Sequence, residues 1–276
     1  METYRNSPGR GFIDAHVHLS APEGLDSVLA AGIIAIRHGG MKTELASADC
    51  FHSEKPVVIS SCWALYKQGG YGARFGVPVN TKQDVKEEIL KLKRSGADII
   101  KVMASGMVSL KKPGTVTAGG FDREELRFIV EEAAALGLGV MAHANGEDAI
   151  TAAAEAGVTS IEHGFFMTSR SLEAMAKKRI FWTPTLGALA RAAEAAGEAV
   201  ETKQFVSTLI RSQLAMVAQA HSSGVPLAVG TDCVLPDPGY GEAYDRELAY
   251  FEEAGLSCEE VMKIAYDDGA RLLGLA

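Results

Sequence analysis

Two histidines occupy alternate positions of a short apolar segment near the start of the chain. The segment reads FIDAHVHL over residues 12–19 and places Asp14, His16 and His18 at every second position. Side chains alternate between the two faces of a β-strand, so these three project from the same face. Because buried parallel strands are normally runs of Val, Ile and Leu, the pattern indicates a polar site. We expect Asp14 to bond the backbone or a neighbouring strand, and the two histidines to bind a cation.

Four further polar residues interrupt apolar segments later in the chain. They are Lys101 in DIIKVMA, His143 in GVMAHA, His163 in TSIEHG and Asp232 in PLAVGTD. Imidazole nitrogens combined with a carboxylate oxygen suit Zn²⁺ and similar divalent cations. The whole set, including His16 and His18, therefore predicts a metal site if the fold brings these segments together.

The number of metal ions in the site depends on the chemical form of the Lys101 amine. A lysine inside an apolar strand has a lowered pKa, so part of it is neutral amine. A neutral amine adds CO₂ to give a carbamate, an anionic group with two oxygens that can bridge two metals about 3.5–4 Å apart. A Schiff-base nucleophile or a lysine that extends to solvent are the alternatives. Since four histidines are available nearby, we favour the carbamate and two ions.

The elements that position these residues alternate between strand and helix patterns. Strand-like segments occur at 11–19, 32–38, 56–62, 98–104, 139–144, 159–164, 180–185 and 226–232, and helix-like stretches with capping residues lie between them. This alternation predicts parallel βαβ units. Eight such units in 276 residues predict one (β/α)₈ TIM barrel, of class α/β, forming a single domain over residues 1–276. The six candidate ligands then lie near the carboxyl ends of their strands, at one mouth.

Three long Gly-containing connections, 63–81, 105–121 and 233–243, follow strands and should surround the same mouth. Tyr71 and Tyr240 on these connections are candidates for a lid or a substrate contact. The basic residues that can pair with a substrate carboxylate, or stay solvated, are Arg37, Arg74, Lys111 and Lys112.

Composition limits the class of protein. The net charge is −8 without a block of like charge, which argues against a nucleic-acid partner and favours a small-molecule substrate. No apolar run approaches the roughly 20 residues of a membrane span, and the first ten residues lack the apolar core of a signal peptide. The four cysteines lack CxxC spacing and suggest reduced thiols in the cytoplasm. The sequence leaves room for a homo-oligomer.

The ordered set of ligands resembles the amidohydrolase superfamily of the binuclear, carboxylated-lysine type. The segments IKVMASG, AHANG, SIEHG, PTL and GTD are similar to those of the imidazolonepropionase-like and Xaa-Pro dipeptidase (prolidase) branch. The resemblance implies two divalent ions, which we expect to be Zn²⁺, with His16, His18 and Asp232 on the more buried ion and His143 and His163 on the other. It also implies a bridging carbamate on Lys101, a bridging hydroxide as nucleophile, and Asp232 as general base and then general acid.

The chain departs from this branch in three ways. Only about ten residues precede the first strand and the chain stops at ARLLGLA, so we expect no accompanying β-sandwich. The second strand ends RHGG, where an acid is expected after the arginine, and QGGYG carries Tyr71 where relatives often have histidine.

The function expected is hydrolysis of an amide-type C–N bond in a dipeptide, an N-acyl amino acid or a cyclic amide. A lactonase or phosphotriester hydrolase uses the same binuclear site. A mononuclear deaminase would use His16, His18, His143 and Asp232 with unmodified Lys101. A barrel that only binds a ligand is the remaining alternative.

Overall fold

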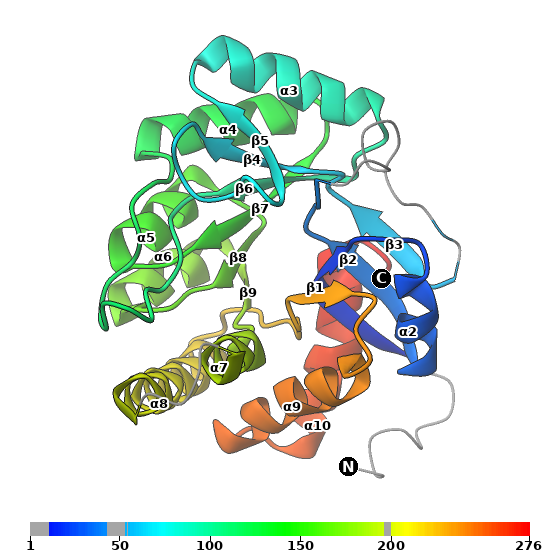
Figure 1. The fold of residues 1–276 in the computed structure, drawn as a ribbon, viewed down its shortest axis with the longest axis vertical. Helices are drawn as coiled ribbons and strands as arrows, with labels where there is room; N and C mark the ends of the chain where they lie inside the picture. Colours follow the sequence, from blue (N-terminus) through cyan, green and yellow to red (C-terminus); the bar gives the residue numbers. More distant parts are fainter. Residues whose placement is uncertain (1–10, 43–52, 54, 196–199) are drawn as a thin grey trace.

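The strands of the protein form two parallel sheets, surrounded by helices in the computed structural model (Figure 1). The structure describes residues 11–42, 53, 55–195 and 200–276. One sheet has the order β10-β1-β2-β3 and the other β5-β4-β6-β7-β8-β9. The strands are β1 (Phe12–Leu19), β2 (Ile33–His38), β3 (Val57–Ser60), β4 (Ala64–Lys67), β5 (Gly76–Val79), β6 (Ile99–Met103), β7 (Gly139–Ala144), β8 (Ser160–His163), β9 (Phe181–Thr183) and β10 (Cys233–Leu235).

Helices follow the strands, as βαβ connections require. They are α2 (Gly24–Ala30), α3 (Lys82–Arg94), α4 (Arg123–Ala135), α5 (Glu147–Ala156), α6 (Ser169–Lys178), α7 (Leu186–Ala195), α8 (Val200–Ser222), α9 (Tyr240–Glu253), α10 (Cys258–Lys263), the π-helical turn η2 (Ile264–Asp268) and α11 (Gly269–Leu273). Thr81, Asp122 and Ser257 form capping boxes at the starts of α3, α4 and α10, which explains why those helices begin where they do. No helix of the described residues is both long and apolar enough to cross a membrane.

Backbone hydrogen bonds join the two sheets at both seams. At one seam Asp98 N donates to Ser60 O over 2.8 Å, which connects the end of β3 to the start of β6. At the other, Trp182 N donates to Pro226 O over 2.9 Å and Ala15 N donates to Val229 O over 2.8 Å. The segment 226–232 thus lies between β9 and β1. The architecture is that of the (β/α)₈ barrel type, as the alternating pattern predicts.

Seven of the eight expected strands are confirmed, with ends that differ by up to two residues. The eighth expectation, a strand over 226–232, is wrong, because only Leu227 makes a ladder-type bridge and the regular strand is β10. Asp14 accepts hydrogen bonds from Thr231 N and Thr231 Oγ1, so this segment bonds to a side chain where a regular ladder would use backbone. The connection 63–81 contains β4 and β5, which the sequence did not reveal.

The expectation of four reduced thiols is also wrong. Cys62 is disulfide-bonded, whereas Cys233 and Cys258 are free. Cys50 lies outside the described residues.

Gly230 permits the close approach of segment 226–232 to β1. A Cβ at this position would lie 2.3 Å from Thr183 Cγ2 and 2.9 Å from His16 Cβ. We expect Gly230→Ala to lower the free energy of unfolding by about 1–3 kcal/mol, because the added carbon overpacks a buried contact. Urea unfolding monitored by circular dichroism measures this change. Gly239→Ala, where the nearest atom is 3.5 Å away, is the matched control, and equal stability of the two variants would contradict the packing argument.

Candidate metal centre

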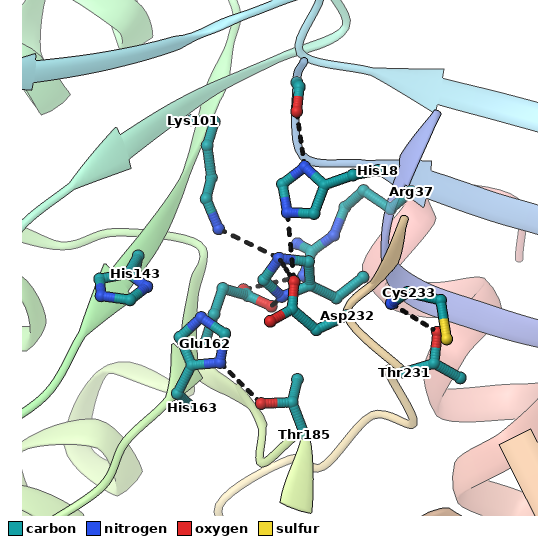
Figure 2. A network of polar contacts seen from close by, with 12 residues as sticks. His18, Arg37, Lys101, His143, Glu162, His163, Thr185, Thr231, Asp232 and Cys233 are labelled. Atoms are coloured by element: carbon teal, nitrogen blue, oxygen red, sulfur yellow. Dashed lines mark hydrogen bonds and ion pairs between the residues drawn. The ribbon is translucent and has the colours of Figure 1, made fainter. Parts of the chain in front are cut away.

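The barrel mouth gathers the six predicted ligand residues around one space. Figure 2 shows His18, Lys101, His143, His163 and Asp232 pointing into it. All six line a single cavity of about 560 Å³. His16 and His18 come from β1, Lys101 from β6, His143 from β7 and His163 from the last position of β8, while Asp232 precedes β10. The expectation that these segments converge on one mouth agrees with the geometry.

His16, His18 and Asp232 form the most compact part of this group. Their ligand atoms all lie within 4.8 Å of one another. The Nε2 atoms of His16 and His18 lie 3.4 and 3.2 Å from Asp232 Oδ1. Two imidazole nitrogens and a carboxylate oxygen are a donor set that suits Zn²⁺ and related divalent cations. The chemistry of the residues therefore fits a metal ion at this point.

A close carboxylate contact at His16 and a hydrogen bond at His18, both on the outer side of the rings, indicate which nitrogen faces the cavity. His16 Nδ1 lies 3.0 Å from Glu162 Oε2 and His18 Nδ1 donates to Gly40 O over 2.5 Å. Nε2 of each ring then carries the free lone pair, as in a metal-binding imidazole whose other N–H is held by a carboxylate or carbonyl. A Cβ on Gly39 would lie 3.1 Å from His18 Cε1 and 3.4 Å from His16 Nε2, so the RHGG segment leaves space beside these nitrogens.

His143 and His163 extend the group on the β7–β8 side. Their ring centroids are 4.6 Å apart, and the His163 centroid is 5.1 Å from that of His16. His143 Nε2 donates to Gly106 O over 3.0 Å, which leaves Nδ1 as the acceptor nitrogen. His163 Nδ1 lies 2.6 Å from Thr185 Oγ1, which leaves Nε2. The two rings thus have one nitrogen each for a second cation.

Burial keeps the imidazoles of His16, His143 and His163 neutral. Removal from water, followed by the positive charge of Lys101, lowers the pKa of His143 to about 4. Burial and then the neighbouring His143 lower the pKa of His163 to about 3, and burial and Lys101 hold the pKa of His16 well below 6.5. A neutral imidazole is the form that binds a metal. These rings are therefore ready to accept a cation at neutral pH.

Lys101 is the buried base of the site. Its side chain is 1% exposed and its Nζ lies 3.4 Å from His16 Nε2. Burial lowers the pKa of this amine to about 8, although the carboxylates of Glu162 and Asp232 oppose the shift. A substantial fraction of the amine is thus unprotonated near neutral pH. For Asp232, burial alone would raise the pKa, but the adjacent imidazoles of His16 and His18 more than offset this and hold the pKa well below 3.8.

Two of the ligand residues have a left-handed backbone. The φ angle is 68° at His163 and 52° at Asp232, a region that costs roughly 1–3 kcal/mol for a non-glycine residue. The strained backbone turns each side chain into the mouth just where its strand or segment ends. This strain is a signature of a functional position, and periodicity in the sequence does not reveal it.

Glu162 is a site residue that the sequence analysis missed. Arg37 Nη2 pairs with its Oε1 over 2.9 Å, and Arg37 Nη1 donates to Ser160 Oγ over 2.8 Å. Both charged side chains are fully buried. Arg37 therefore neither contacts substrate nor is solvated, and instead holds the carboxylate that orients His16. The only signal in the sequence was an acid in TSIEHG, one position before the ligand His163.

The predicted substrate contacts differ in their placement. Tyr71 lines the cavity, with its ring centroid 5.1 Å from that of His143. Burial raises the pKa of Tyr71, so its hydroxyl stays protonated. Arg74 is exposed, outside the cavity lining, with its Cζ 5.9 Å from the Phe75 ring centroid. Tyr240 is 1% exposed and donates to Asp14 Oδ2 over 3.0 Å, so it is a core residue and cannot act as a lid.

The sequence of this chain is similar to those of known proteins. The amidohydrolase family model matches residues 11–276, and the chain belongs to this family. Ochratoxinase of Aspergillus niger is 32% identical over 185 residues, which cover 66% of this chain but only 38% of the relative. The matched region is thus less than half of that curated relative.

Solved structures show the same fold. A Xaa-Pro dipeptidase with bound methionine superposes with a TM-score of 0.79 at 22% identity, covering 96% of this chain and 75% of that one. The crystal structure of A. niger ochratoxinase superposes with a TM-score of 0.77 at 24% identity, covering 96% and 71%. The family model confirms the resemblance to the amidohydrolase superfamily, and these two structures share the fold of this chain.

The carboxylate behind His16 gives a testable prediction. Glu162→Gln removes the charge that holds the Nδ1 proton of His16, so we expect Zn²⁺ affinity to fall about 10–100-fold. Competition with a fluorescent chelator measures the affinity. Glu155→Gln, an exposed acid paired with Arg123, is the matched control. Unchanged affinity in a folded Glu162→Gln protein would show that Glu162 does not position the ligand.

Proposed function

We propose that this protein is a metal-dependent hydrolase that cleaves an amide-type C–N bond. The observation that carries the proposal is the convergence of four imidazoles, a buried lysine and an ionised carboxylate at the mouth of a barrel of the amidohydrolase family. Ochratoxinase and Xaa-Pro dipeptidase, two proteins similar to this chain, are named for amide-cleaving activities. Membership of the family alone would not support the reaction, since function depends on the residues of the site.

Each residue of the site would have a separate role in this reaction. His16, His18 and Asp232 would hold one divalent ion, and His143 and His163 a second. Divalent cations in such a site supply a Lewis acid and lower the pKa of water. Asp232 Oδ1, 3.4 Å or less from both β1 imidazoles, is ionised and can accept a proton from the attacking water and return it to the departing amine. Tyr71, protonated and facing the cavity, can donate a hydrogen bond to the substrate.

We also propose that Lys101 carries a carbamate. The unprotonated Nζ would add to the carbon of CO₂, forming an N–C bond and releasing one proton, and the amine would become an anionic group with two oxygens. Two anionic oxygens at Nζ suit a position between two cations, whereas an ammonium there would repel both. Zn²⁺ is the ion we expect, because nitrogen ligands predominate.

A single-metal site is the second candidate. It is favoured by the compactness of the group formed by His16, His18 and Asp232, from which His143 and His163 are absent. This arrangement would leave Lys101 unmodified, as in a mononuclear deaminase. Lactone and phosphotriester hydrolysis use the same residues as the amide reaction and are separated from it only by a substrate panel.

Asp232→Asn tests the proposed reaction. We expect the rate of amine release from amide substrates by the Zn²⁺-loaded protein to fall at least about 100-fold, because the variant cannot accept the proton. Asp26→Asn, an exposed acid on α2, is the matched control and should retain the wild-type rate. A wild-type rate in folded Asp232→Asn protein would remove this residue from the mechanism, and hydrolysis of lactones but not amides would overturn the bond assignment.

The carbamate has its own test. After incubation with ¹³C-bicarbonate and Zn²⁺, we expect a carbamate resonance in the ¹³C NMR spectrum and a metal content of two ions per chain. Lys101→Ala should lack the resonance and bind at most one ion, whereas Lys86→Ala, on the surface of α3, should behave as the wild type. A Lys101→Ala protein with the resonance, or with two ions, would contradict the assignment.

A further inference from the structure

The cavity above the candidate ligands has apolar walls on two facing sides. One wall comes from the segment 106–117, in which Val108 and Val116 form an antiparallel bridge and Thr117 N donates to Met107 O over 2.8 Å. This hairpin presents Met107, Val108 and Leu110 to the cavity. Met107 is 46% exposed, an unusual exposure for a methionine that lines a pocket.

Helix α7 forms the opposite wall with Ala188, Leu189 and Ala192. Val108 and Leu110 of the hairpin pack against the apolar cluster that contains Leu189 and Phe165. The hairpin and α7 therefore meet through apolar side chains, and residues of both line the same cavity. Apolar side chains form no hydrogen bonds with a polar substrate group, so this surface favours an apolar one.

Hydrogen bonds from two polar side chains hold α7 in place. Glu247 of α9 accepts hydrogen bonds from Leu186 N and Gly187 N, at the start of the helix. Arg191 Nη2 donates to Thr231 O over 2.7 Å, one residue before Asp232. Helix α7 is thus hydrogen-bonded to the segment that carries the candidate catalytic carboxylate. A substrate group bound on α7 therefore has a defined position relative to Asp232.

The described residues that line the cavity above the ligands carry little charge. Among the described residues of the cavity, Lys111 is the one charged side chain apart from Lys101 and Asp232. Lys111 is exposed at the rim. An ion pair with an exposed lysine contributes little, at most a few-fold in affinity. Burial of a phenyl-sized group contributes about tenfold to a hundredfold. Apolar burial therefore outweighs recognition of a substrate carboxylate.

We propose that the cleft between the 106–117 hairpin and α7 is a subsite for a bulky apolar substrate group, and that the preferred substrates are amides that carry an aryl or branched alkyl group, with no strict need for a carboxylate. The inference rests on the proposed amide hydrolysis and names its substrate class. It distinguishes this chain from a peptidase that requires the terminal carboxylate of a dipeptide.

The test compares amides that differ only in these two features. N-acetylglycine has a carboxylate and no apolar group, N-acetylphenylalanine has both, and N-acetylphenethylamine has only the apolar group. We expect kcat/KM of the Zn²⁺-loaded protein to be at least tenfold higher for each aryl amide than for N-acetylglycine. The two aryl amides should differ by less than about fivefold. Equal rates for N-acetylglycine and N-acetylphenylalanine, or a loss of more than 100-fold without the carboxylate, would overturn the proposal.

A binding measurement separates the subsite from the chemistry. In the Asp232→Asn background, NMR titration should show that N-acetylphenethylamine binds at least tenfold more tightly than N-methylacetamide. Ala192→Asp places a charge on the α7 wall at an exposed position and should abolish this preference. Ala195→Asp, exposed on the same helix but outside the lining, should retain it. Equal affinities for the two amides would overturn the subsite, whereas the expected binding without any hydrolysis by wild-type protein would overturn only the proposed function.

Discussion

His16 is the residue on which the organisation of the site depends. Its Nδ1 faces the buried Glu162 carboxylate, and its Nε2 lies 3.4 Å from both Lys101 Nζ and Asp232 Oδ1. Arg37 holds Glu162 from behind. The positive Arg37 on β2, the negative Glu162 on β8 and the imidazole of His16 on β1 thus lie in a row. The row ends at His16 Nε2, a neutral nitrogen with a free lone pair. Burial of charged groups costs folding free energy unless each group is paired. A cation bound at His16 Nε2 would provide the last pairing of this row.

The barrel supplies the low dielectric that makes these groups reactive. Burial lowers the pKa of His16, His143 and His163, so that each of these rings is neutral with one nitrogen lone pair free, and it lowers the pKa of Lys101 to about 8. The same burial would neutralise Asp232 if His16 and His18 did not flank it. Burial therefore favours the neutral form of the nitrogen ligands and of the Lys101 amine. The carboxylate of Asp232 stays ionised because His16 and His18 flank it. The apolar hairpin and α7 extend this environment outward over the substrate cleft.

Periodicity predicted much of this arrangement, and its failures have physical causes. The alternation in FIDAHVHL and the strand-end positions of Lys101, His143 and His163 were visible because polar residues stand out in apolar strands. The regular strand expected over 226–232 failed because the Asp14 carboxylate takes hydrogen bonds that a ladder would use. Tyr240 was misplaced because a Gly-rich neighbourhood resembles a loop, whereas the residue begins α9 and is buried. Glu162 was missed and Arg37 was given the wrong role, since a buried ion pair between distant strands leaves no periodic pattern.

The central claim is that these side chains enclose a pair of cations with a modified lysine between them. Crystals grown with Zn²⁺ and bicarbonate, measured at the zinc absorption edge, test it most directly. The account predicts two anomalous peaks about 3.5–4 Å apart, one within about 2.0–2.2 Å of His16 and His18 Nε2 and the other beside His143 and His163, with added density at Lys101 Nζ. A zinc-saturated crystal with a bare Lys101 amine, or without a peak at His16 Nε2, would contradict it.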